Sequence, residues 1–205
     1  MSQVTKSILV GGVLLASIAV AACQPKVLRG GEGTENPNLD RPALSTKLDK
    51  ADLDYLVSQN LGPLLESRFW TRDVEGAPGE PIVAIWPIRN ATSEHLEDQM
   101  LQLLSSIETA LVNSGEVRVV ARARQEQLAQ EIGFQQSATF DPGSARRLGR
   151  QLGAQYLVTG KLTGVDERLD KTRRIQYSLF MQVLEIETGI VKFQHESARS
   201  KAIQR

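Results

Sequence analysis

Side chains able to do acid–base, nucleophilic or metal chemistry are few and scattered in this sequence. The two histidines, His95 and His195, lie in different predicted elements, and Cys23 is the single cysteine. No H-x-x-x-H pair, second cysteine or G-x-S-x-G elbow supplies the spacing of a zinc site or a serine nucleophile. We therefore predict no catalytic residue, no metal and no cofactor, although a triad assembled in space would escape a search by spacing.

Two other patterns have ordinary explanations. Gly30 to Gly33 could be mistaken for a phosphate loop, but no strand precedes it and no helix follows, so we interpret it as part of a flexible segment. Several arginines lie on or near one predicted helix. Such a group usually forms a solvent-exposed face; the alternative is a surface that contacts an acidic partner or anionic peptidoglycan. These residues are Arg122, Arg124, Arg146, Arg147 and Arg150.

The clearest chemical signal in the sequence is a pattern that indicates lipid attachment at Cys23. Lys6 is followed by an uncharged, mostly apolar stretch over residues 7–22, typical of a signal peptide and too short for the roughly 20 apolar residues of a membrane span. The run Val20-Ala21-Ala22-Cys23 resembles the bacterial lipobox. We predict a signal peptide over residues 1–22 and acylation of Cys23; an ordinary secretory signal with a buried or free thiol is the alternative.

Residues 23–47 are rich in glycine, proline, asparagine and charge, and have only scattered hydrophobic residues. Such a segment cannot bury enough apolar surface to order itself, so we predict a disordered tether. Fully extended, it reaches about 80 Å. Residues 48–205 are left for one globular domain, and the balance of 24 basic and 24 acidic residues gives no indication of nucleic-acid binding.

Hydrophobic periodicity predicts an alternation of helices and strands in this domain. We expect Asp49 to cap the first helix, Gly62-Pro63 to break or kink it, and a bulge or cover on both faces where Phe180, Leu184 and Ile186 interrupt a strand pattern. The last three strands form an antiparallel meander. The fold class is α/β: a single domain with a mixed or mostly antiparallel sheet of about five strands flanked by helices. In chain order the expected elements are a helix over 48–66, a strand over 82–86, a helix from about 96 to 112, a strand over 116–121, helices over 122–132 and 141–153, and strands over 155–168, 174–187 and 190–197.

Two polar loops are candidates for partner recognition, because loops held by rigid elements suit binding. In the first, the alternative role of every side chain is to cap the following helix; in the second, Phe140 can equally belong to the core. We predict that the two loops form one contact patch. Its residues are Asn90, Thr92, Ser93 and Glu94 in the first loop and Gln135, Gln136, Ser137 and Phe140 in the second.

Several of these segments resemble the LpoB-type activator lipoproteins of bifunctional penicillin-binding proteins. The resemblance spans roughly Leu48 to Ala198, and part of it is shared with curli-secretion lipoproteins and the N-terminal domain of TolB. The segments that carry it are Arg89-Asn90-Ala91-Thr92-Ser93-Glu94-His95, Gly133-Phe134-Gln135-Gln136-Ser137 with Asp141-Pro142, Leu152-Gly153-Ala154-Gln155-Tyr156, Leu184-Glu185-Ile186-Glu187-Thr188-Gly189 and Phe193.

The resemblance implies a TolB N-terminal-like fold and a noncatalytic monomer, lipid-anchored at the periplasmic face of the outer membrane, that binds the docking domain of a bifunctional penicillin-binding protein and activates peptidoglycan synthesis. Gln24 after the cysteine, where an aspartate marks retention at the inner membrane, agrees with an outer-membrane location. The tether is shorter than the proline-rich linker of well-known members. A structural role in an envelope secretion or pore assembly is the alternative.

Overall fold

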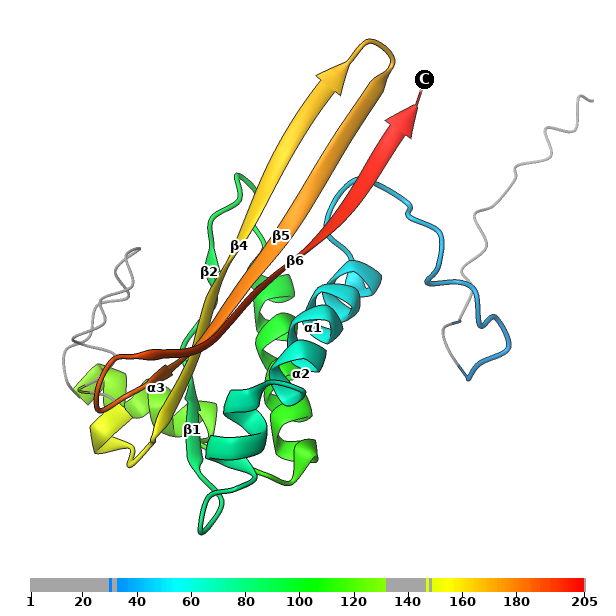
Figure 1. Cartoon of the computed structure of the whole chain (residues 1–205). Helices are drawn as coiled ribbons and strands as arrows, with labels where there is room; N and C mark the ends of the chain where they lie inside the picture. The colour runs from blue at the N-terminus through cyan, green and yellow to red at the C-terminus, as the bar shows by residue number, and fades with distance from the viewer. Residues whose placement is uncertain (1–29, 31–32, 132–146, 148, 205) are drawn as a thin grey trace, which may run out of the picture.

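The computed structural model describes residues 30, 33–131, 147 and 149–204. These residues form helices and strands in an α/β order (Figure 1). The elements are α1 (Lys50–Leu65), the π-helical turn η1 (Trp70–Val74), β1 (Ile82–Ile85), β2 (Arg89–Asn90), α2 (Glu97–Ser114), β3 (Arg118–Val119), α3 (Arg122–Glu131), β4 (Tyr156–Leu169), β5 (Thr172–Glu185) and β6 (Val191–Gln204).

One mixed, six-stranded sheet organises the domain. Its strand order is β3-β1-β4-β5-β6, and β2 pairs with β4 beyond the end of β1. Strands β1, β2 and β3 make parallel pairs, whereas β4, β5 and β6 form an antiparallel meander. The predicted fold class and meander are confirmed, with one more strand than expected. The register of β5 against β6 shifts between Val183 and Leu184, which is the irregularity that the broken alternation predicts.

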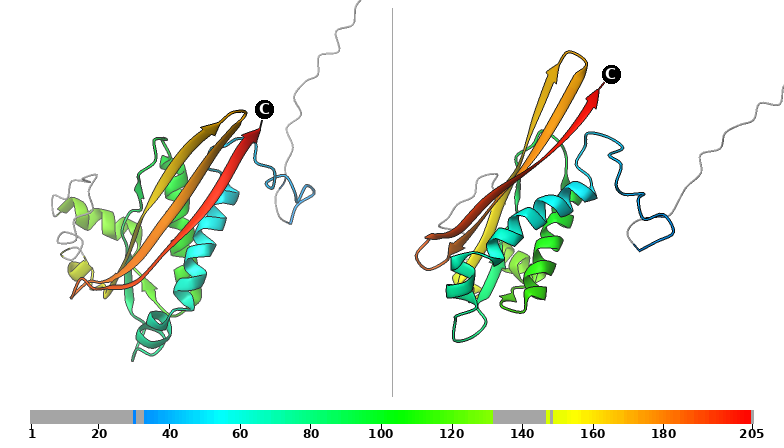
Figure 2. Two further views of the ribbon diagram at one scale, coloured as in Figure 1. Left: turned by 45° about the horizontal axis from the view of Figure 1, so that its top comes forward. Right: turned by 45° about the vertical axis from the view of Figure 1, so that its right-hand side comes forward.

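The main hydrophobic core lies between one face of the sheet and helices α1 and α2 (Figure 2). Alternation along β5 explains this arrangement, because every second side chain points to the helical side. Those residues, Ile175, Tyr177, Leu179, Met181 and Val183, are all buried. On the opposite face a smaller cluster forms around Ala84, Ala154, Leu157 and Ile186.

Helix α1 departs from the sequence prediction at its C-terminal end. Asp49 caps the helix as expected, in a capping box with Asp52, but Pro63 lies inside the helix, which continues to Leu65. The predicted break is wrong because Pro63 falls in the last turn, where the missing N–H costs only one hydrogen bond. Burial of Leu64 against the core holds that turn in place.

Helix α2 differs from the prediction at its N-terminal end. Its N-cap residue is Leu96, whose side chain makes no capping hydrogen bond. The polar residues of loop 90–94 therefore do not cap this helix, and the capping interpretation is wrong. The C-terminal end is as predicted, since Gly115 adopts a left-handed φ of 75° that favours glycine.

The meander extends well beyond the helical layer (Figure 1). We name this extension the arm and define it as residues 163–178 and 198–204, which pair in register from the Thr163–Ser178–Ala198 row outward. A two-residue turn at Asp170 and Lys171 closes its tip, with Asp170 at a φ of 51°. Ion pairs between neighbouring strands, Asp166 with Arg173 and Glu167 with Arg174, brace it.

The predicted helix over 141–153 falls largely outside the described residues. Arg147 and residues 149–151 are helical, and Gly149 lies so close to the Ile186 side chain that a Cβ at this position would collide with it. This close approach joins the end of the helix to the smaller core cluster on the outer face of the sheet.

Candidate functional site

Loop 90–94 holds its shape through its own hydrogen bonds. The side-chain oxygen of Asn90 accepts from the backbone N–H of Thr92 at 3.0 Å and from its hydroxyl at 2.7 Å. The amide nitrogen of Asn90 donates to the Glu94 carbonyl at 2.8 Å, and the Glu94 N–H donates to the Thr92 hydroxyl at 3.1 Å. The loop is therefore ordered before any partner binds, which lowers the entropic cost of recognition.

The loop rests on the base of the arm. Thr92 packs over Gly164 of β4, where an added Cβ would lie 3.4 Å from the Thr92 methyl carbon, in ordinary van der Waals contact. Ser93 is exposed at the outside of the loop, and Glu94 is partly buried beneath it. The loop thus offers hydrogen-bonding groups and one carboxylate on a rigid support, an arrangement suited to binding.

Glu94 is bound by Tyr177 from β5. The Tyr177 hydroxyl lies 3.0 Å from both Glu94 carboxylate oxygens and 3.3 Å from the carbonyl oxygen of Thr46, and the side chain is only 1 % exposed. Burial, and then the hydrogen bond with Glu94, raise the pKa of Tyr177 above its ordinary value. The hydroxyl is therefore protonated and acts as a hydrogen-bond donor over the physiological pH range.

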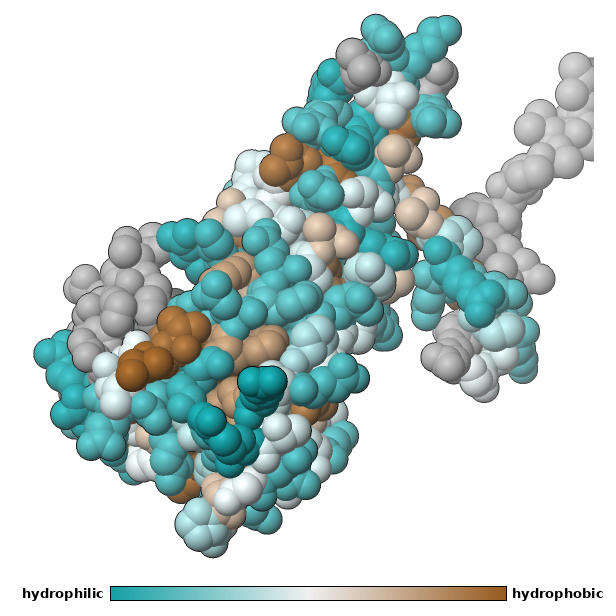
Figure 3. All heavy atoms as spheres, viewed as in Figure 1, coloured by the Kyte–Doolittle hydropathy of each residue, from teal (hydrophilic) through white to brown (hydrophobic). Residues whose placement is uncertain are grey.

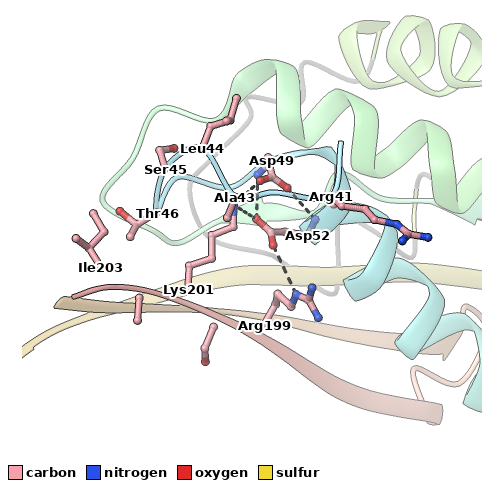
Figure 4. Close-up of a pocket in the computed structure, with 13 residues that line it drawn as sticks. Arg41, Ala43, Leu44, Ser45, Thr46, Asp49, Asp52, Arg199, Lys201 and Ile203 are labelled. Carbon is pink, nitrogen blue, oxygen red and sulfur yellow. Dashed lines mark hydrogen bonds and ion pairs between the residues drawn. The ribbon is translucent and has the colours of Figure 1, made fainter. Parts of the chain in front are cut away.

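The segment that enters α1 is fixed beside this contact. We name residues 46–49 the tether root. Lys201 of β6 donates to the Lys47 carbonyl at 2.7 Å and forms ion pairs at 2.5 Å with both Asp49 and Asp52 (Figure 4). Burial alone would lower the pKa of Lys201, but its hydrogen bonds to the two carboxylates outweigh that effect and raise it. The Lys201 ammonium therefore stays charged.

A shallow pocket of about 280 Å³ opens between the tether root and β6. Figure 4 shows that Lys201 and Arg199 reach from β6 toward the carboxylates of Asp49 and Asp52. These four charged side chains thus pair with one another, Arg199 lying 3.7 Å from Asp52. The pocket is a structural junction between the tether root and the arm.

The remaining candidate residues are placed as follows. Gln135, Gln136, Ser137 and Phe140 lie outside the described residues, as does Cys23. The joint patch of two loops and the lipid attachment therefore stay predictions. Sequence reasoning missed Tyr177 and Lys201 as contacts of the loop and of the tether root. A buried tyrosine in an alternating strand was the available signal, because its hydroxyl needs a partner.

The two histidines of the chain lie in different surroundings. His95 is exposed, and His195 stacks on Phe193 with ring centroids 6.5 Å apart. Among the described residues no group of three or more histidine, cysteine, aspartate or glutamate side chains is arranged to hold a metal ion. The same part of the chain contains no helix that is long and apolar enough to cross a membrane. The surface in Figure 3 is largely hydrophilic on the face shown.

Comparison with known proteins yields one family and solved structures of similar fold. A family model described as the peptidoglycan-synthase activator LpoB matches residues 52–198. The LpoB C-terminal domain from Salmonella enterica is 19 % identical, with a TM-score of 0.50 over 73 % of this chain and 98 % of that domain. The Escherichia coli domain is also 19 % identical, with a TM-score of 0.51 over 71 % and 98 %. At this identity the two structures establish the fold alone. No curated protein matches by sequence.

Proposed function

Because the chain belongs to the family of peptidoglycan-synthase activators of the LpoB type, we propose that it binds a bifunctional penicillin-binding protein and raises its rate of peptidoglycan synthesis. The observation that carries this proposal is the family match, which covers the domain from the first turn of α1 to the middle of β6. The fold shared with two LpoB C-terminal domains supports it.

In this proposal the protein is an activator and not an enzyme. An activator must bind the active conformation of the synthase more tightly than the idle one, because a ligand with equal affinity for both shifts nothing. The preordered loop 90–94 suits that role, since a rigid surface selects one conformation of its partner. We include Asn90, Thr92, Ser93 and Glu94 in the contact surface.

The proposal places the protein at the periplasmic face of the outer membrane, as a monomer held by acyl chains on Cys23. Residues 23–47, fully extended, reach about 80 Å. The docking domain of the synthase must therefore project outward far enough for the domain to meet it.

The test is polymerisation of lipid-linked precursor by candidate bifunctional synthases, with and without the purified full chain. Stimulation of at least one synthase, with direct binding to it, is expected. Absence of both binding and stimulation across all candidates would refute the proposal.

A matched pair of substitutions locates the contact. Ser93→Arg places a bulky cation on the exposed side of the loop, and Ser58→Arg makes the same change on the exposed face of α1. We expect Ser93→Arg to weaken binding at least tenfold and Ser58→Arg to leave it unchanged. Equal effects of the two substitutions would exclude the loop from the contact surface.

A further inference from the structure

The hydroxyl of Tyr177 faces more hydrogen-bond acceptors than it has protons. Both oxygens of the Glu94 carboxylate and the carbonyl oxygen of Thr46 lie within hydrogen-bonding distance. A hydroxyl carries one donor proton, so Tyr177 can serve Glu94 of the loop or Thr46 of the tether root, but not both at once.

In the structure described here, Glu94 is the favoured acceptor. Its oxygens lie at 3.0 Å, against 3.3 Å for the Thr46 carbonyl, and a hydrogen bond to a carboxylate is stronger than one to a neutral carbonyl. Thr46 is buried, so its carbonyl oxygen has little access to water as a substitute. While the Tyr177 hydroxyl donates to Glu94, the Thr46 carbonyl oxygen therefore lacks this hydrogen bond, and the tether root is less stable than it could be.

We propose that Tyr177 is a hydrogen-bond switch that couples loop 90–94 to the tether root. When a cationic group of a partner takes the Glu94 carboxylate, the Tyr177 hydroxyl turns to the Thr46 carbonyl and strengthens the root. The tether root then gains one whole hydrogen bond, on the Thr46 carbonyl oxygen.

The coupling has a reciprocal form. A partner that binds Glu94 tightens the root, and by linkage an ordered root favours that partner. Lys201, which binds the carbonyl of Lys47 and the carboxylate of Asp49, keeps the root close enough for the hydroxyl to reach. The part played by the partner rests on the proposed function, but the switch itself is a property of this chain alone.

The test is amide hydrogen exchange of the full chain without any synthase, followed in peptides that contain residues 46–49. Glu94→Ala removes the competing acceptor, so amide exchange in the tether root should slow about three- to tenfold. This factor corresponds to the free energy of one hydrogen bond between neutral groups. In a Tyr177→Phe background the same Glu94→Ala change should have no effect on the root. Tyr156→Phe, which removes the hydroxyl of another buried tyrosine on the same sheet face, serves as the matched control and should leave the response to Glu94→Ala intact.

Two results would overturn the switch. One is exchange in the root that is unchanged or faster after Glu94→Ala. The other is slowing of the same size in both the tyrosine and the phenylalanine background. If Glu94→Ala fails to fold, Glu94→Gln provides the second variant, with a neutral acceptor and an expected slowing of smaller size. Because no synthase is present, a negative result here leaves the proposed function untouched, and a failed stimulation assay leaves the switch untouched.

Discussion

Replacement of Lys201 by methionine should remove a large part of the stability at the junction between α1 and β6. The Lys201 side chain is 8 % exposed, and its ammonium pairs with Asp52, whose side chain is 3 % exposed, and with Asp49, whose side chain is 41 % exposed. Methionine keeps the length of the apolar stem, so the substitution mainly deletes the charge and its three hydrogen bonds.

The size of the loss follows from the different burial of the two carboxylates. Removing one partner of a buried ion pair typically costs 3–5 kcal/mol, because a buried charge is left without compensation. Asp49 can turn to solvent, and Arg199 lies 3.7 Å from Asp52, so the lower end applies. We expect the free energy of unfolding to fall by about 3 kcal/mol, or the melting temperature by about 6–12 °C for a domain of this size.

Urea denaturation at neutral pH measures this loss. Lys171→Met, the same change at the exposed turn of the arm, is the control and should alter stability by less than about 0.5 kcal/mol. A loss below about 1 kcal/mol for Lys201→Met would show that the buried ion pairs give little net stability, and would refute the reasoning.

The pH dependence gives an independent check. Burial pushes the pKa of Asp49 upward, but hydrogen bonds from Lys201 and from the Asp52 backbone outweigh burial and hold it below its ordinary value. A lowered pKa stabilises the fold at neutral pH, and this contribution is lost as pH falls through the folded-state value, below about 4. The raised pKa of Lys201 stabilises the fold below about pH 10, and that contribution is lost as pH rises further. The difference between wild type and Lys201→Met should therefore shrink at both extremes.

Three further predictions concern single positions. Asn60→Ala removes a fully buried amide whose nitrogen lies within hydrogen-bonding distance of two carbonyl oxygens and a hydroxyl, and should lower the free energy of unfolding by about 2–3 kcal/mol in urea denaturation. Gly160→Ala drives a Cβ into the Phe180 carbonyl and should cost more than about 3 kcal/mol, whereas Gly164→Ala on the same strand face should cost less than about 1 kcal/mol; similar losses for both would contradict the packing argument. Asn90→Ala deletes the hydrogen bonds that shape the loop, and should speed amide exchange in residues 92–94 at least fivefold while lowering overall stability by less than about 1.5 kcal/mol.

The sequence predicts the fold well where periodicity is strong. Alternation along β5 identified its buried face, and the interrupted pattern near Leu184 pointed to the register shift that the structure contains. The break expected at Pro63 was wrong, because a proline in a last turn loses little. Helix propensity alone does not predict whether tertiary packing allows a helix to continue beyond a proline.

The site was less accessible to sequence reasoning. Loop 90–94 was found because polar residues follow a strand, but their assignment as caps failed, since Asn90 and Thr92 bind one another and not the helix. The contacts of Tyr177 with Glu94 and of Lys201 with Asp52 join residues far apart in the chain. No local pattern reports such pairs, because they depend on the register of β5 and β6.

The arm also bears on how copies of this chain avoid one another. In the described part of the chain, β6 and the outer half of β4 border no further strand, and such edges invite sheet growth between molecules. Asp166 and Glu167 on β4, each matched to an arginine of its own hairpin, give this border a charge pattern that is already satisfied internally. A strand of a second copy added to this edge of β4 would bring its own side chains against these charged residues, and charge along an edge strand disfavours such pairing.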